Sequence, residues 1–353
     1  MKKSQLKFNV RRLTTCTAIV LAGMLASCSN DDVKNDPVQP EETTTETLKV
    51  ISGASQKGRV QNFVETRASK STKLKLVAEI AAPKERKDLN WSATAIDFNG
   101  AKAYVTWHSN KQAKNPAKEW GGAVDVIELN GNDELEISST AVSKLLKFNH
   151  VLYADNKLFL GATSATDAGV VGRISLVNEG IAEDADIEII GFPGVSVNAV
   201  AKYGKELIAV SGYKGTYGTF APDAANQPYY DGDKDKRENV VTDLRPEADD
   251  FNNFGGKYVT TDEKEEVYVL HNTENATITK VETGKSVTLE GISLVSAVKV
   301  AETYDPITKE WIPSTDEHNY YGKHVLAVRN GKAYVGCGKN GLVVWDLANN
   351  KRP

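Results

Sequence analysis

The sequence predicts an all-β fold that is built from one repeated unit. Short strands rich in aromatic and β-branched residues recur along the chain, and each follows a polar turn that usually contains Lys. A second apolar strand precedes each turn, so every unit has the pattern of a β-hairpin. The spacing of the units suits the blades of a β-propeller with loops of uneven length.

Five copies of this hairpin follow one another. Their second strands, with the turns before them, are Asn99–Trp107, Asp155–Gly161, Tyr203–Val210, Glu263–Leu270 and Asn330–Gly336. Their first strands are Ala93–Asp97, His150–Ala154, Val197–Ala201, Lys257–Thr261 and His324–Val328. A third strand is expected in four copies, at Gly122–Leu129, Gly169–Leu176, Ala276–Val281 and Gly341–Leu347. The copies predict about five blades; six or seven would follow from a degenerate copy or a truncated sequence.

Closure of the ring is expected from the residues before the first copy. Leu74–Ile80 alternates apolar and polar residues but has no hairpin partner of its own. The last copy ends shortly after its third strand. Leu74–Ile80 is therefore predicted to complete the last blade and to close the propeller.

The last copy carries a family resemblance. Its segment Asn330–Leu347 contains Leu342-Val-Val-Trp-Asp346 after a Gly-rich turn. This segment resembles the LVIVD repeat of bacterial surface β-propeller lipoproteins, whereas the other four copies share only its hydrophobic pattern. The resemblance implies a β-propeller that belongs to the cell envelope.

The first residues predict an exported lipoprotein. Basic residues precede an apolar stretch, Cys16–Leu25, which is too short for a permanent membrane span because about ten helical residues reach only about 15 Å. Leu25-Ala-Ser-Cys28 resembles a lipobox. Residues 1–27 are thus predicted to be a signal peptide, and Cys28 is predicted to carry acyl chains such as palmitate. A signal peptide that leaves Cys28 unmodified is the alternative.

The polar composition after Cys28 predicts a tether. Residues 28–73 are expected to be a flexible segment, with order beginning between Leu48 and Leu74. Residues 74–353 are the predicted propeller domain, with a long insertion at 213–253. The acidic Ser29–Asp32 resembles the tag that directs lipoproteins to the cell surface, so an outer-membrane protein exposed at the surface is expected. A periplasm-facing anchor is the alternative.

Charge and composition exclude several classes of function. A formal net charge of −4 gives no basic field, so nucleic acid is not an expected partner. After export and lipidation Cys337 is the one remaining thiol, so no intramolecular disulfide can form. The histidines in the repeat copies, His108, His150, His271 and His324, show no metal-ligand spacing. Phosphate-binding loops, dinucleotide fingerprints and the Gly-x-Ser-x-Gly motif do not occur.

Most candidate ligand-binding residues lie in the insertion. Long irregular loops are uncommon unless they are functional or disordered. Aromatic rings on such a loop can stack on sugar rings or anchor a protein partner. The candidates are Tyr213, Tyr217, Tyr229 and Tyr230, together with Trp120 and Trp311 from two other loop-like segments. The alternative is that these rings only fix the loops to the scaffold.

Three carboxylates in the insertion have the spacing of a calcium-binding loop. They are Asp231, Asp233 and Asp235. Lys236 and Thr242 stand where an EF-hand loop needs Gly and Glu, so a solvated acidic turn is the alternative. No cofactor other than calcium is expected.

These observations favour a non-enzymatic binding module for a glycan or an envelope protein partner, held at the membrane through Cys28. A carbohydrate-active hydrolase or lyase on the same scaffold is one alternative, and a structural component of an uptake or adhesion complex is another. The fold alone cannot choose between them. Two or three carboxylates with a histidine at one channel mouth would favour the enzyme, whereas a channel filled by side chains would favour binding.

Overall fold

The computed structural model describes most of the repeat region. The described residues are 45–62, 78–85, 89–109, 120–129, 134–165, 169–192, 194, 196–211, 217–224, 242–244, 256–272, 275–292, 294–299, 302–305, 310–313, 317–321, 324–337 and 341–353. No helix within these ranges has the length and apolar character needed to cross a membrane.

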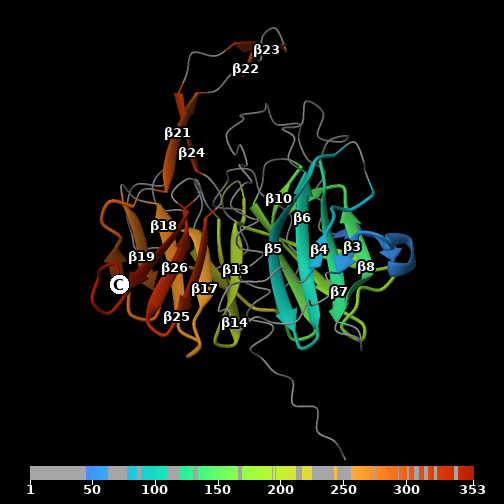
Figure 1. Ribbon diagram of the computed structural model, residues 1–353, viewed down its shortest axis with the longest axis horizontal. Coiled ribbons are helices and arrows are strands. Elements are labelled where there is room, and N and C mark those ends of the chain that lie inside the picture. Colours follow the sequence, from blue (N-terminus) through green and yellow to red (C-terminus); the bar gives the residue numbers. More distant parts are fainter. Residues whose placement is uncertain are drawn as a thin grey trace, which may run out of the picture.

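Five antiparallel sheets follow one another along the chain, one for each predicted hairpin copy (Figure 1). Sheet 1 contains β5 (Trp91–Asn99), β6 (Lys102–Ser109), β7 (Gly122–Leu129) and β8 (Leu135–Ser143). Sheet 2 contains β9 (Leu146–Ala154), β10 (Lys157–Ser164), β11 (Gly169–Ser175) and β12 (Asp186–Gly191). Sheet 3 contains β13 (Ala199–Tyr203), β14 (Glu206–Val210), β15 (Tyr217–Phe220) and β16 (Thr242–Asp243). Sheet 4 contains β17 (Gly256–Thr261), β18 (Val267–Asn272), β19 (Ala276–Lys280) and β20 (Lys285–Thr288). Sheet 5 contains β25 (Val325–Arg329), β26 (Lys332–Gly336) and β27 (Leu342–Asp346).

The hairpin turns have the predicted chemistry. In sheet 5, Asn330 and Gly331 have φ angles of 51° and 69°. In sheet 2, Asp155 and Asn156 have φ angles of 50° and 58°. Two successive residues with positive φ form the turn that matches the twist of the paired strands, which explains the Asn, Asp and Gly at these positions.

The outer strands β8, β12, β16 and β20 were not predicted. In β20, Val287 is the one buried residue, so the alternation that marks a strand is weak. In sheets 3 and 4, the fourth strands β16 and β20 form the outer edge.

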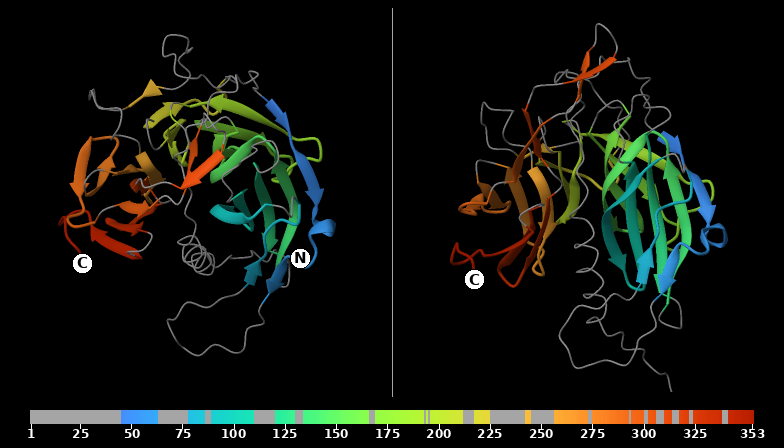
Figure 2. Two further views of the ribbon diagram at one scale, coloured as in Figure 1. Left: turned by 90° about the horizontal axis from the view of Figure 1, so that it is seen from above. Right: turned by 45° about the horizontal axis from the view of Figure 1, so that its top comes forward.

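The sheets are arranged around a common centre, so the chain has the architecture of a β-propeller (Figure 2). The first strand of each sheet contacts the first strand of the next, from β5 through β9, β13 and β17 to β25. Apolar side chains fill the spaces between neighbouring sheets. Tyr104 and Phe148 lie between sheets 1 and 2, and Leu270 and Trp345 lie between sheets 4 and 5. The first strands are therefore the innermost strands and face this common centre, which we name the channel.

Residues 45–62, which we name the strap, lie in the segment that was expected to be a tether. The strap contains β1 (Thr45–Thr47), β2 (Lys49–Ser52), the short helix η1 (Gly53–Gln56) and β3 (Val60–Asn62). β1 pairs with β12 of sheet 2, and β2 pairs with β8 of sheet 1. The expectation of a flexible tether is thus corrected for residues 45–62, because backbone pairing orders a segment with few apolar residues.

The predicted ring closure is also corrected. The described part of Leu74–Ile80 is β4 (Ala78–Ile80), and it pairs with β3 rather than with the last sheet. Val60 and Ile80 contact the apolar side of sheet 1 formed by Val105, Trp107 and Ile127. The two short strands therefore cover a face of sheet 1.

Two features alter the expected loops. β15 and β16 show that parts of the insertion at 213–253 belong to sheet 3. Between sheets 4 and 5, β21 (Val295–Lys299) pairs with β24 (Glu317–Tyr321), and β22 (Glu302–Asp305) pairs with β23 (Glu310–Pro313). Figure 1 shows these four strands, which we name the arm, extending away from the five sheets at the end drawn uppermost.

Candidate functional site

Side chains on the innermost strands join neighbouring sheets at the channel. Asp97 on β5 accepts a hydrogen bond from the main-chain N–H of Tyr153 on β9, with Oδ2 2.6 Å from the nitrogen. Thr94 donates to the carbonyl of Phe148 at 2.9 Å. These main-chain groups lie on the inner edge of a sheet, where side chains take the place of a further strand.

His150 on β9 joins three sheets. The main-chain N–H of Val200 on β13 donates to His150 Nδ1 at 3.3 Å, so Nδ1 is the unprotonated ring nitrogen. Nε2 then carries the proton and donates to the hydroxyl of Tyr258 on β17 at 2.9 Å. Sheets 2 and 4 are not neighbours in the ring, so the His150–Tyr258 bond spans the inner edge of sheet 3, which lies between them.

Burial sets the charge states of these groups. Desolvation lowers the pKa of His150 to about 4, so its imidazole is neutral at neutral pH. Burial, followed by the negative charge of Asp97, raises the pKa of the Tyr258 hydroxyl. Burial also raises the pKa of Asp97, against the hydrogen bonds from Tyr153 and Phe98. The His150–Tyr258 link is therefore an uncharged pair.

Asn149 on β9 forms hydrogen bonds with several polar groups of neighbouring sheets. Its amide nitrogen donates to Ser196 Oγ at 2.9 Å and to the carbonyl of Val197 at 3.1 Å. Thr163 donates to Ser196 Oγ at 2.7 Å. His108 Nδ1 lies 3.4 Å from Asn149 Oδ1. These polar groups therefore supply one another's hydrogen-bond partners across sheets 1, 2 and 3.

The other buried histidines occupy separate positions. The ring of His271 meets the edge of Tyr217, with ring centroids 5.4 Å apart, and burial lowers its pKa to about 4. His324 Nε2 lies 2.8 Å from the carbonyl of Leu294. The repeat histidines do not converge on one point. Over the described ranges, no group of three or more His, Cys, Asp or Glu residues could hold a metal ion.

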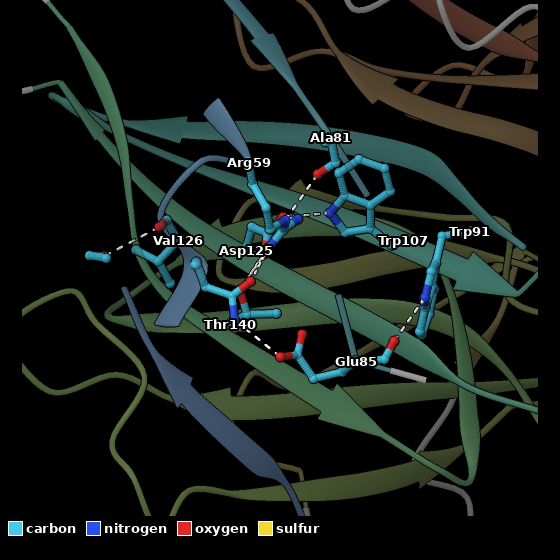
Figure 3. Close-up of polar contacts among 10 residues, drawn as sticks. Arg59, Ala81, Glu85, Trp91, Trp107, Asp125, Val126 and Thr140 are labelled. Carbon is cyan, nitrogen blue, oxygen red and sulfur yellow. Dashed lines mark hydrogen bonds and ion pairs between the residues drawn. The ribbon is translucent and has the colours of Figure 1, made fainter. Parts of the chain in front are cut away.

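A buried ion pair joins the strap to sheet 1 (Figure 3). Arg59 Nη2 lies 2.6 Å from Asp125 Oδ2, and the two side chains are 1% and 0% exposed. Arg59 Nη1 donates to Asp125 Oδ1 at 2.9 Å and to Gln56 Oε1 at 2.8 Å. Arg59 Nε donates to the carbonyl of Ala81 at 3.0 Å. The planar guanidinium thus meets the carboxylate with two parallel hydrogen bonds.

Asp125 has two further donors. Trp107 Nε1 donates to Oδ2 at 2.7 Å, and Thr140 Oγ1 donates to Oδ1 at 2.5 Å. This site was not predicted from the sequence, although a carboxylate in the middle of the apolar strand Gly122–Leu129 is a signal for it. Buried carboxylates require partners, so Asp125 could have indicated a cation on a neighbouring element.

Two of the predicted ligand-binding rings are buried. Tyr217 is 6% exposed and packs on His271 between sheets 3 and 4. Trp120 is 7% exposed, and Lys147 Nζ lies 3.9 Å from the centroid of its ring. Neither ring forms an exposed stacking surface in this structure. This burial fits the alternative that the rings only fix their loops to the scaffold.

The remaining predicted residues have other outcomes. Trp311 lies in β23 of the arm, opposite Tyr304 in the strand register. Tyr213, Tyr229, Tyr230, Asp231, Asp233, Asp235 and Cys28 lie outside the described residues. Cys337 is buried, and desolvation raises the pKa of its thiol to about 11, so its reactive thiolate form is rare at neutral pH.

The sheets and their shared channel define the chain as an all-β protein of the β-propeller class. No family model matches the sequence, and no curated protein matches it. A crystal structure of a nidogen/laminin complex has a chain with 12% identity, a TM-score of 0.48, and coverage of 87% of this chain and 91% of that chain. A crystal structure of the mitotic checkpoint complex has a chain with 9% identity, a TM-score of 0.41, and coverage of 82% and 74%. A structure of YCF48 bound to a D1 peptide has 9% identity, a TM-score of 0.36, and coverage of 76% and 68%.

Proposed function

We propose that this chain is an envelope-anchored lipoprotein whose propeller is a non-enzymatic binding module for a glycan or an envelope protein partner. The hydrogen bond from His150 to Tyr258 carries this proposal. It commits both side chains to protein partners at the centre of the ring, which suits a binding module better than an active site built on these groups.

The protonation states of the channel residues support the same function. A general base needs a pKa near the working pH and a free lone pair. His150 uses Nδ1 to accept from Val200 and Nε2 to donate to Tyr258, and its pKa of about 4 lies far below neutrality. Asp97 uses both oxygens to accept main-chain N–H groups. These groups act as connectors between sheets.

The arm is the proposed contact surface. In the described residues the arm consists of two separate two-stranded ribbons. Ribbons of only two strands are marginally stable alone in water. A partner that covers the arm would supply the missing contacts. The resemblance of Leu342–Asp346 to the LVIVD repeat supports an envelope location, and the lipobox at Cys28 supports anchoring, with exposure at the cell surface.

A glycan array and an envelope pull-down with the full chain test the proposal. The comparison variant lacks residues 295–321, with a short Gly-Ser link in their place. His324 Nε2 lies 2.8 Å from the carbonyl of Leu294, so the ends of the arm are close enough for this link. Capture of a defined glycan or envelope protein that the variant loses supports the proposal.

Cleavage products in the same samples would instead indicate the carbohydrate-active enzyme. Reducing ends released from the array glycans are the measurement for a hydrolase. Unsaturated sugar ends are the measurement for a lyase. Either product, made by the full chain and by the variant without the arm, would overturn the binding module.

A further inference from the structure

The strap crosses the boundary between two sheets. β1 lies on the outer edge of sheet 2, and β2 lies on the outer edge of sheet 1. Leu48 lies between them, is 3% exposed, and donates its main-chain N–H to the carbonyl of Ala185 at 3.1 Å. Separation of sheets 1 and 2 at the rim therefore requires the strap to leave at least one of them.

Apolar burial alone does not fix the register of the strap. Its fully buried residues are Leu48, Gln56 and Arg59, and the last two are polar. The half-buried apolar residues that pack on the core are Val50, Ile51 and Val60. Thr45, Thr47 and Lys49 are exposed. Short strands with few apolar residues have a weakly specified register. Specific polar contacts must therefore fix where the strap binds.

Two carboxylates supply these contacts. At the start of the strap, Glu46 accepts from Ser143 Oγ at 2.5 Å and from the main-chain N–H of Lys144 at 2.6 Å, both at the end of β8. Toward the other end, the Arg59 guanidinium binds Asp125 on β7. A strap shifted by one residue would lose both contacts together.

The Arg59 contact makes partial docking unfavourable. Asp125 is fully buried, and its charge is compensated by Arg59 while the strap is docked. If Arg59 left and the rest of the strap stayed, an unpaired carboxylate would remain in a low-dielectric environment.

We propose that the strap is a two-state element, docked on sheets 1 and 2 or released as one unit, and that Arg59 is the residue that holds it docked. Release uncovers the outer edges of β8 and β12, which are then open for backbone pairing. The docked strap thus protects two strand edges of the propeller.

Thiol reactivity in the full chain tests this proposal. Leu48→Cys places a reporter in the strap, and Cys16→Ser and Cys28→Ser remove the N-terminal thiols. Cys337 in sheet 5 is 4% exposed and reports on unfolding of the propeller. Arg59→Gln should raise the labelling rate at residue 48 about a hundredfold, because removal of one partner of a buried ion pair is strongly destabilising, and should leave Cys337 protected.

Matched variants separate the possible outcomes. Arg329→Gln removes an exposed arginine, whose side chain is 62% exposed, and should change neither rate. Millimolar methylguanidinium should slow labelling at residue 48 in Arg59→Ala by refilling the site on Asp125. Hydrogen exchange of residues 45–52 with Leu48 intact repeats the test without the reporter. Unchanged strap protection in Arg59→Gln, or equal acceleration at Cys337, would overturn the proposal.

Discussion

The carboxylate of Asp97 accepts the main-chain N–H of Tyr153 at 2.6 Å, so the innermost strand of sheet 1 holds the innermost strand of sheet 2. Asp97→Ala should lower the free energy of unfolding by about 1–3 kcal/mol, because it leaves this N–H without its acceptor. Denaturant unfolding measures the change. Glu206→Ala, at the exposed first residue of β14, should change stability by less than about 0.5 kcal/mol. Equal effects of the two substitutions would contradict the role of Asp97.

His150 predicts a pH dependence of stability. Its pKa is lowered from 6.5 to about 4 in the folded protein. In the pH window between these two values the unfolded chain therefore binds a proton that the folded chain does not. Stability should therefore fall as the pH drops through this window and level off below it, with a total of about 3 kcal/mol from this group.

The comparison for this pH dependence is His150→Gln. The raised pKa of Asp97 acts in the opposite sense, since the folded protein then binds the extra proton. Subtracting the pH dependence of His150→Gln stability from that of the wild type removes the contribution of Asp97. Unfolding curves at pH 7 and pH 4.5 give the measurement, and parallel behaviour of the two proteins would refute the prediction.

Gly122 on sheet 1 lies close to the backbone of sheet 2. A Cβ atom there would lie 2.7 Å from the carbonyl oxygen of Leu146 and 2.8 Å from the backbone nitrogen of Phe148. Gly122→Ala should therefore cost about 1–3 kcal/mol of stability. Gly180→Ala is the control, because its nearest contact would be at 3.5 Å. Thermal unfolding of both variants measures the difference.

Cys28 should carry the lipid. Cys28→Ala should abolish incorporation of labelled palmitate and should leave the protein in the soluble fraction after cell lysis. Cys16→Ala should change neither result. Protease treatment of intact cells then measures surface exposure, and protection of the wild-type protein would favour the periplasm-facing anchor.

The repeated hairpins could be predicted from the sequence because each is a local pattern. Asn330 and Gly331 set a turn, and the strands beside them bury alternate residues. The strap could not be predicted, because its order comes from pairing with β8 and β12 rather than from its own composition. The link between His150 and Tyr258 joins residues 108 positions apart, so no local pattern contains it.

The same link limits how the chain can evolve. Repeat proteins commonly gain and lose units, because each unit contacts only its neighbours. The bond between His150 and Tyr258 spans from sheet 2 to sheet 4 and fits only when one sheet stands between them. A duplicated unit inserted there would move the two side chains apart. Descendants of this chain that keep both residues should therefore add or lose units only outside sheets 2 to 4.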